Sequence, residues 1–334
     1  MDDGSTDDSG AICDEYAEIY LRIKVYHIHN AGASHARKYG LNHMQGEYVT
    51  FVDSDDIVED DYLERLYKAV NQYGVRIAAC DQIKHQEGTD LIVDKSGEVM
   101  LLDNKAIQDR FFKYQFWGLG GKIYHKSVFE GVYFPEYTIN EDYVVMAQLF
   151  NLQKQMAYVP MGLYHYMTHG DSLSHQKLSK RMFAEYYNKL WVRDFYAEKN
   201  PRYIENAEAQ LTETCIKLIR CVSMEDKEKN YQKEKGDMQA YLRSNLFSIM
   251  FNPYLKMGLK FMLLKCMLSS WGDEKCPLMC FGVWFHEIQD DGFNSALHGP
   301  QQKNSHLWGT IRFVTHYVSI LALHIEILCA VRTK

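Results

Sequence analysis

The most constraining feature of this sequence is a short apolar run that ends in a cluster of carboxylates. Residues 48–52 are all aromatic or β-branched, which favours a β-strand. They run directly into Asp53, Asp55 and Asp56. Because ligands bind at the carboxyl ends of strands in open α/β sheets, we expect a functional site at this strand end.

The spacing of these carboxylates predicts a metal site. Alternate side chains of an extended segment point to the same side, so Asp53 and Asp55 are expected to converge. Two such charges repel each other unless a cation lies between them, and hard oxygen ligands favour Mg²⁺ or Mn²⁺. The alternative interpretation is a solvated acidic turn.

The first half of the chain alternates short apolar runs with helical periods, which is typical of an α/β sheet flanked by helices. The opening helix is expected to bury a face made of Ile12, Tyr16, Ile19 and Tyr20. The other expected elements are a buried strand at 25–28, a helix at 33–45, a helix at 60–73, a strand at 76–80 and a hairpin or edge region at 82–102.

The character of the chain changes at about residue 177, where helical patterns replace strand signals. We therefore predict an α/β catalytic domain over residues 1–180, a helical region over 181–269 and a poorly patterned tail over 270–334. An amphipathic or buried helix is expected within the tail at 313–331, because two histidines and a glutamate there are costly at a bilayer centre.

Composition limits which binding partners and which cellular compartment we expect for this protein. The formal net charge is −7 with scattered Lys and Arg, so nucleic acid is not an expected partner. The eight cysteines show no paired spacing, which predicts reduced thiols in the cytoplasm. A zinc site of Cys276, Cys280 and His286 is the alternative, but it lacks a fourth ligand.

The segment 251–268 mixes lysines with large apolar residues. This pattern is typical of a helix that lies on a membrane surface, or of one that packs on the catalytic domain. Core packing is the simpler interpretation of the two. Peripheral contact with the inner face of the cell membrane is the alternative.

Four motifs in one order carry a family resemblance. They are the opening MDDGSTDDS, the loop Asn30-Ala31-Gly32 with Arg37, the run 46–56, and Asn140-Glu141-Asp142. Over residues 1–180 the chain resembles family 2 glycosyltransferases with a GT-A type fold. The resemblance implies an α/β fold with a Rossmann-like sheet.

The resemblance implies a role for each matching residue. Asp3, with Asp2 and Ser5 beside it, would contact the nucleobase of the donor. Asn30, Gly32 and Arg37 would lie near the donor, where a guanidinium meets diphosphate charge. Asp53 would hold the ribose or assist the metal, and Asp55 would ligate it. Trp117, before a glycine-rich segment, would stack on a sugar.

Glu141 and Asp142 resemble the acidic pair that supplies the catalytic base of the family, most often the Asp. They open a predicted helix, whose positive end favours an ionised carboxylate. The implied reaction is one in-line displacement with inversion. It moves a sugar from a nucleotide-diphosphate donor, by analogy a UDP-sugar, to a saccharide or lipid-linked acceptor in surface polysaccharide or glycan synthesis.

The resemblance also implies a missing segment. Family members begin with a strand, a helix and a strand before the DDGS motif, so about 30 residues, one βαβ unit, are expected to be absent. The alternative function is therefore an inactive remnant that binds nucleotide-sugar weakly. A phosphatase-like hydrolase with Asp53 as nucleophile and Asp55 as acid is a further alternative, but its usual partner residues are missing.

Overall fold

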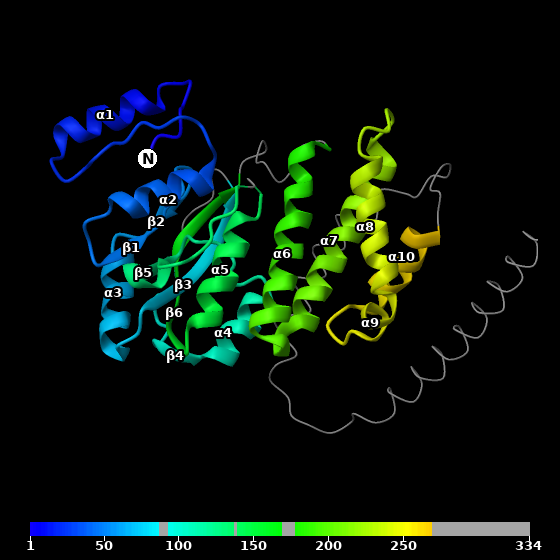
Figure 1. The fold of residues 1–334 in the computed structure, drawn as a ribbon. Helices are drawn as coiled ribbons and strands as arrows, with labels where there is room; N and C mark the ends of the chain where they lie inside the picture. The colour runs from blue at the N-terminus through cyan, green and yellow to red at the C-terminus, as the bar shows by residue number, and fades with distance from the viewer. Residues whose placement is uncertain (87–92, 137–138, 169–177, 269–334) are drawn as a thin grey trace, which may run out of the picture. The chain divides into compact units, whose positions relative to one another are not determined.

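A computed structural model describes residues 1–86, 93–136, 139–168 and 178–268, which all belong to one compact unit, Met1–Gly272. A six-stranded sheet lies at the centre of its first part (Figure 1). The strands are β1 (Tyr48–Thr50), β2 (Ile57–Val58), β3 (Ile77–Gln86), β4 (Met100–Asp103), β5 (Lys122–His125) and β6 (Gln155–Thr168).

The sheet is mixed rather than uniformly parallel. Its order is β1-β5-β3-β6-β2, with β4 also paired to β6. β3 and β6 run parallel, whereas the pairs β1–β5, β3–β5, β2–β6 and β4–β6 are antiparallel. The α/β class is confirmed. For 82–102 the edge region is the alternative that forms among the described residues, because β4 pairs with β6 at the side of the sheet.

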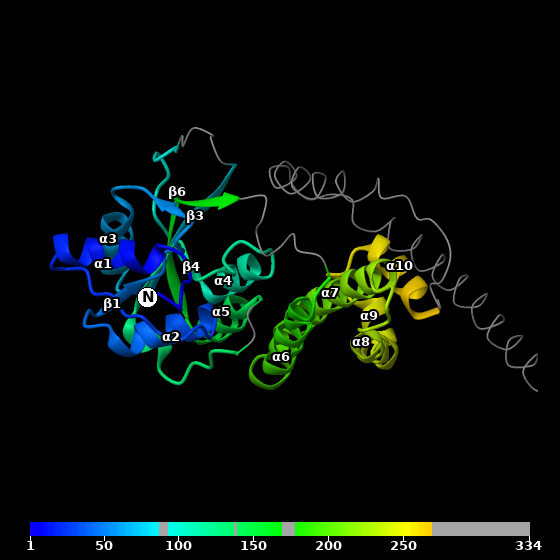
Figure 2. The same cartoon turned by 90° about the horizontal axis from the view of Figure 1, so that it is seen from above.

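Helices cover both faces of the sheet (Figure 2). One face packs against α3, whose Leu66 and Val70 share a buried cluster with Ala78 and Val159. The other face packs against α4 and α5, through residues such as Phe111 and Phe150. The helices of this part are α1 (Ser9–Ile19), α2 (Ala33–His43), α3 (Tyr62–Tyr73), α4 (Asn104–Phe111), the 3₁₀ helix η1 (Lys126–Phe129) and α5 (Glu141–Leu152).

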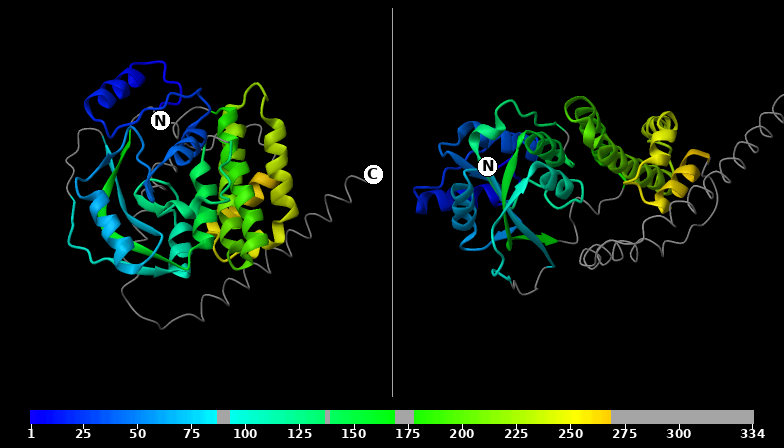
Figure 3. Two further views of the ribbon diagram at one scale, coloured as in Figure 1. Left: turned by 60° about the vertical axis from the view of Figure 1, so that its left-hand side comes forward. Right: turned by 90° about the horizontal axis from the view of Figure 1, so that it is seen from below.

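The predicted helical region is confirmed up to residue 268 (Figure 3). Its helix α6 contacts α5, and Val192 and Tyr196 of α6 belong to the same buried cluster as Phe150. A second core lies among α6 to α10. The bounds are η3 (Lys180–Phe183), α6 (Ala184–Lys199), η4 (Pro201–Tyr203), α7 (Ile204–Glu225), α8 (Gln232–Ser244), α9 (Leu246–Phe251) and α10 (Met257–Leu268).

Two expectations at the N-terminus are wrong. Helix α1 buries none of its side chains, and Ile12, Tyr16, Ile19 and Tyr20 are exposed, because no other described element packs against that face. The stretch 25–28 is not a strand. It forms one isolated bridge, between His27 and Asp2, because the short segment around Asp2 is its neighbour.

Several predictions on membranes and thiols are settled only for part of the chain. No helix among the described residues is both long and apolar enough to cross a bilayer. The five cysteines in the described part are unpaired. The zinc candidate Cys276, Cys280 and His286, and the helix expected at 313–331, lie outside the described residues.

A buried charge network joins α6 to α7. Lys189 Nζ donates to Thr214 Oγ1 at 2.8 Å and lies 3.3 Å from Glu185 Oε1. The other carboxylate oxygen of Glu185 pairs with Lys217 Nζ at 2.9 Å. Burial alone would raise the pKa of Glu185, but the charges of Lys189 and Lys217 outweigh it and lower that pKa to about 2. The ionised carboxylate therefore stabilises the fold.

We expect Glu185→Gln to lower the free energy of unfolding by about 3 kcal/mol at neutral pH, because it leaves a buried lysine without its charge partner. The effect should shrink as pH falls from the ordinary 4.5 of a glutamate toward about 2, where the native carboxylate also takes up its proton. Denaturant titrations at several pH values measure it. The exposed Glu198→Gln on the same helix is the control, and equal losses in both variants would contradict the network's role.

Candidate active site

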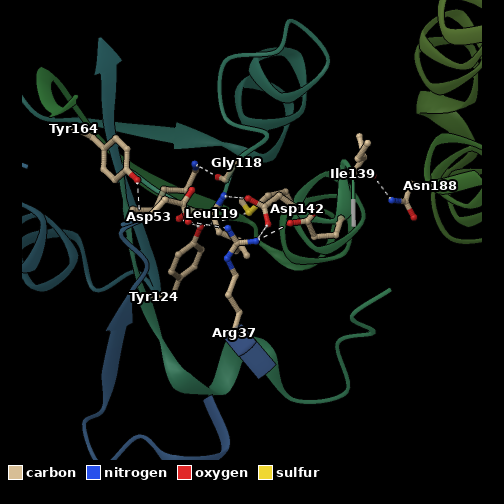
Figure 4. A network of polar contacts seen from close by, with 12 residues as sticks. Arg37, Asp53, Gly118, Leu119, Tyr124, Ile139, Asp142, Tyr164 and Asn188 are labelled. Carbon is tan, nitrogen blue, oxygen red and sulfur yellow. Dashed lines mark hydrogen bonds and ion pairs between the residues drawn. The ribbon is translucent and has the colours of Figure 1, made fainter. Parts of the chain in front are cut away.

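One arginine of α2 joins two distant acidic motifs (Figure 4). Arg37 Nη1 donates to Glu141 Oε1 at 2.9 Å and to Asp142 Oδ1 at 2.7 Å. Its Nη2 donates to Asp53 Oδ1 at 2.9 Å. The side chain is only 14% exposed. The loop after β1 and the first turn of α5 are therefore held together by one guanidinium.

The charges of this cluster do not cancel. Burial opposes the charge of Arg37, but the carboxylates of Asp142, Asp53 and Glu141 outweigh it and raise the pKa of the guanidinium. Burial, reinforced by Asp142, raises the pKa of Glu141 to about 7, and burial also raises the pKa of Asp142. Three carboxylates around one cation leave an excess of negative charge, so the cluster favours a proton or a further cation.

A glycine-rich segment holds the second oxygen of Asp142. Leu119 N–H donates to Asp142 Oδ2 at 3.0 Å. On either side of Leu119, the carbonyls of Gly118 and Gly120 accept hydrogen bonds from Lys122 Nζ. Lys122 is 1% exposed, and burial lowers the pKa of its ammonium to about 8. The buried lysine thus fixes the segment that orients Asp142.

The acidic run after β1 forms a turn rather than an extended segment. Asp56 N–H donates to the carbonyl of Asp53 at 3.0 Å. The expected alternation that points Asp53 and Asp55 the same way is therefore wrong in its geometry. Burial raises the pKa of Asp56 and outweighs the hydrogen bonds from Tyr164 and Met167 N–H, and the charges of Asp55 and Asp53 raise it further.

Tyr164 of β6 anchors this turn. Its hydroxyl accepts from Asp53 N–H at 3.2 Å and donates to Asp56 Oδ2 at 2.6 Å. The space beside the ring is filled closely, since a Cβ on Gly120 would stand 2.7 Å from the tyrosine Cζ. Glycine at position 120 therefore lets the segment that orients Asp142 lie against the tyrosine that orients Asp53.

Asp53 and Asp55 are the carboxylates of this turn that ligand oxygens can reach. Both residues are exposed. The described residues hold no group of three or more His, Cys, Asp or Glu side chains around one point. Mg²⁺ is commonly bound through one or two carboxylates together with phosphate oxygens, so two aspartates suit a metal that also contacts a diphosphate.

The opening motif meets the loop before α2. Asp3 accepts hydrogen bonds from Ala31 N–H at 3.0 Å and Gly32 N–H at 2.7 Å. Gly4 packs so closely that a Cβ there would lie 2.8 Å from Asn30 N. Asp3, Asn30 and Gly32 are therefore brought together, at the start of the helix that carries Arg37.

Asp2 and Ser5 form a hydrogen bond within the opening motif. Asp2 Oδ1 accepts from Ser5 N–H at 2.9 Å, and its Oδ2 lies 2.7 Å from His27 Nδ1. Hydrogen bonds from Ser5 and His27 lower the pKa of Asp2. The carboxylate of Asp2 is buried, whereas Ser5 is exposed beside it.

Trp117 lies next to the base candidate. Its ring packs edge-to-face on Tyr114, with centroids 5.6 Å apart. The following residue is Gly118, where a Cβ would lie 3.9 Å from Asp142 Oδ2. A partly exposed indole is therefore adjacent in the chain to the position that contacts Asp142.

Three residues that organise the site were not predicted from sequence. They are Lys122, Tyr164 and Asn188, whose Nδ2 donates to the carbonyl of Ile139 at 2.7 Å just before the acidic pair. Figure 4 shows Asn188 reaching this segment from α6. Lys122 follows two glycines and would ordinarily be read as a surface residue, so the sequence carries no local signal for its burial.

The chain is similar in sequence to known glycosyltransferases. Residues 1–132 match the profile described as glycosyl transferase family 2. Glycosyltransferase GlyA of Streptococcus pneumoniae is 36% identical over 194 residues, which cover 55% of this chain and 28% of that protein. Glycosyltransferase GlyG of the same organism is 27% identical over 205 residues, which cover 58% of this chain and 65% of that protein.

The fold also has solved counterparts. The crystal structure of S. aureus TarS 1-349 in complex with UDP-GlcNAc superposes with a TM-score of 0.59 at 16% identity, over 80% of this chain and 78% of that one. This likeness shows the fold. The chain spans less than two thirds of the length of the two curated relatives named above. The first 132 residues are therefore similar to glycosyltransferase family 2, on a fold that is shared with TarS.

Proposed function

We propose that the chain is an inverting glycosyltransferase that moves a sugar from a UDP-sugar to a hydroxyl of a saccharide or lipid-linked acceptor in surface polysaccharide synthesis. The observation that carries the proposal is the partly buried pair Glu141 and Asp142, which Arg37 links to Asp53 at the strand end. The crystal structures of TarS in complex with UDP-GlcNAc and with UDP support a UDP-linked donor.

In the proposed reaction Asp142 acts as the general base. The acceptor hydroxyl gives its proton to the Asp142 carboxylate while its oxygen attacks the anomeric carbon of the donor. The bond from that carbon to the diphosphate oxygen breaks, and the diphosphate leaves with the electron pair. One displacement inverts the anomeric configuration. Leu119 N–H and Arg37 hold both oxygens of the base in place.

The remaining residues of the site have assigned roles in this proposal. Asp3, Asn30 and Gly32 bind the nucleoside, with Asp2 and Ser5 shaping their loop. Trp117 stacks on a sugar ring. A Mg²⁺ or Mn²⁺ ion held by Asp55 and Asp53 would stabilise the negative charge of the leaving diphosphate. The phosphatase-like alternative gains no support, because Asp53 is paired with Arg37.

We expect Asp142→Asn to lower the rate of sugar transfer by about a hundredfold to ten-thousandfold, because the amide cannot take up the acceptor proton. Donor affinity should stay within about twofold, since base removal alone leaves ground-state binding in place. Product formation with a panel of UDP-sugars, followed by mass spectrometry, gives the rate, and calorimetry gives the donor affinity.

The exposed Glu64→Gln on α3 serves as the matched control and should transfer normally. Near-native transfer by Asp142→Asn would show that the base is assigned wrongly. NMR of the product tests inversion separately. Donor binding by the unsubstituted chain without any transfer would support the inactive-remnant alternative.

The pH dependence of kcat/KM should follow the ionisation of Glu141 and Asp142. Burial raises the pKa of Glu141 to about 7 and also raises the pKa of Asp142. We therefore expect kcat/KM to fall as pH drops through the raised pKa of Asp142, where the base becomes protonated. The nearby positive charge of Lys122 favours the ionised form of Asp142. Lys122→Met should therefore move the acid limb to higher pH.

Calorimetry with UDP verifies that Lys122→Met still folds and binds nucleotide. An acid limb below pH 5 in the unsubstituted protein would contradict a buried base. An unmoved limb in a folded Lys122→Met protein would show that Lys122 does not act through Asp142.

Removal of the metal should stop transfer. We expect a chelator to lower activity by at least about a hundredfold and added Mn²⁺ to restore it, because the metal offsets charge on the leaving diphosphate. Asp55→Ala should lose both activity and calorimetric Mn²⁺ binding in the presence of UDP. The exposed Asp109→Ala is the control for loss of a surface carboxylate. Full activity in chelator would contradict metal dependence.

A further inference from the structure

Two aromatic side chains lie beside the proposed base, on the segment that leads from α4 to the glycine-rich residues. Trp117 is 36% exposed and Tyr114 is 39% exposed. Their rings meet edge to face, with centroids 5.6 Å apart and planes at 80°. Trp117 is followed by Gly118, where a Cβ would lie 3.9 Å from Asp142 Oδ2. Large side chains next to the site of proton transfer are therefore open to solvent.

Tyr114 is held in a backbone conformation that favours glycine. Its φ is 60°, and among the described residues other than glycine only Asn140 and Lys229 share a positive φ. Tyr114 N–H donates to the carbonyl of Phe111 at 3.1 Å, at the end of α4, where glycine is the usual residue in this conformation. Strain of this kind persists only where the surroundings hold it, and it is common at functional sites. The turn is therefore a place to look for a use of the tyrosine side chain.

The hydroxyl of Tyr114 contacts a carboxylate of the helical region. Tyr114 Oη donates to Glu213 Oε2 of α7 at 3.4 Å, which is long for a hydrogen bond. In the described part of the chain Glu213 has no other hydrogen bond and no ion pair. Lys189 Nζ lies 5.4 Å from the centroid of the Tyr114 ring, but this ammonium is already bound by Glu185 and Thr214.

Glu213 therefore has unused capacity to accept hydrogen bonds. The residue is half-buried. Burial raises its pKa, and the charge of Lys189 and the hydrogen bond from Tyr114 only partly offset this effect. The ionised carboxylate would be stabilised by further donors. Hydroxyl groups supply such donors, whereas a phosphate would meet a like charge at this carboxylate.

We propose that Glu213 and Tyr114 bind hydroxyl groups of a neutral saccharide acceptor, in a subsite whose apolar wall is Trp117. A sugar ring presents an apolar face to an indole and hydroxyl donors to a carboxylate. Both parts of the protein build this subsite, because Trp117 and Tyr114 follow α4 whereas Glu213 lies on α7. The inference rests on the proposed function, since it assigns the ligand beside Asp142 to the acceptor.

Transfer kinetics with the full chain test the subsite. The probes are the methyl β-glycosides of glucose, galactose and N-acetylglucosamine, with glycerol 3-phosphate as an anionic acceptor. We expect the acceptor KM for the best glycoside to rise about tenfold in Glu213→Gln and about fivefold in Tyr114→Phe, because each variant loses a contact to a sugar hydroxyl. The kcat and the donor KM should stay within about twofold, since neither residue touches the reacting atoms.

The matched control is Glu205→Gln, which changes an exposed carboxylate of the same helix and should leave the acceptor KM unchanged. Saturation-transfer NMR of the same glycosides, recorded without donor, measures saccharide binding independently of transfer. Binding that is weakened in Glu213→Gln, in a protein that transfers no sugar, would support the subsite and contradict the proposed reaction.

An unchanged acceptor KM in Glu213→Gln, while transfer continues, would overturn the subsite and leave the proposed reaction standing. A preference for glycerol 3-phosphate over every glycoside would do the same. Equal rises of the acceptor KM in Glu213→Gln and Glu205→Gln would also overturn it, as would the absence of an NMR signal with all three glycosides.

Discussion

The contact on which this site depends is the partly buried ion cluster around Arg37. Asp53 and the pair Glu141–Asp142 are separated by almost ninety positions in the chain, and the guanidinium reaches all three carboxylates. Without a cation among them, such acids could not be ionised so close together. Burial raises the pKa values of the acidic pair, whereas the charge of Arg37 lowers both and that of Lys122 lowers the pKa of Asp142. The same guanidinium therefore couples the ionisation of the acidic pair to that of Asp53.

Positioning of the base extends well beyond Arg37. Lys122 fixes the glycine segment whose Leu119 N–H binds Asp142, and Tyr164 packs against Gly120 while it holds the turn of Asp53. Asn188 binds the carbonyl of Ile139 from α6. Because α6 shares a core with α5, the helical region acts as part of the support of the acidic pair. The domain boundary predicted near residue 180 lies between segments that pack on each other. The division into domains stays a prediction.

Sequence reasoning located the parts of the site whose pattern is local. The strand before Asp53, the helix that carries Arg37 and the helix that begins at Glu141 each follow from propensity and periodicity, and all three elements form. It failed where the outcome depends on tertiary neighbours. The apolar stripe of α1 predicts burial that no described element supplies. The turn of the DSDD run is held by Tyr164, which lies far away in the sequence. The burial of Lys122 depends on hydrogen bonds to backbone carbonyls, which no local sequence pattern indicates.

The acidic groups of the site divide into two environments with different chemistry. Asp53 and Asp55 stand on an exposed turn, where water and ligand oxygens can complete the shell of a hard cation. Glu141 and Asp142 are largely shielded from solvent, where ionisation is disfavoured and a carboxylate becomes a stronger base. Such a division is the usual way for a protein to give chemically identical side chains separate tasks. Arg37 binds carboxylates of both environments. A change in charge on the exposed turn therefore acts on the acidic pair, and the reverse, through the side chain of Arg37.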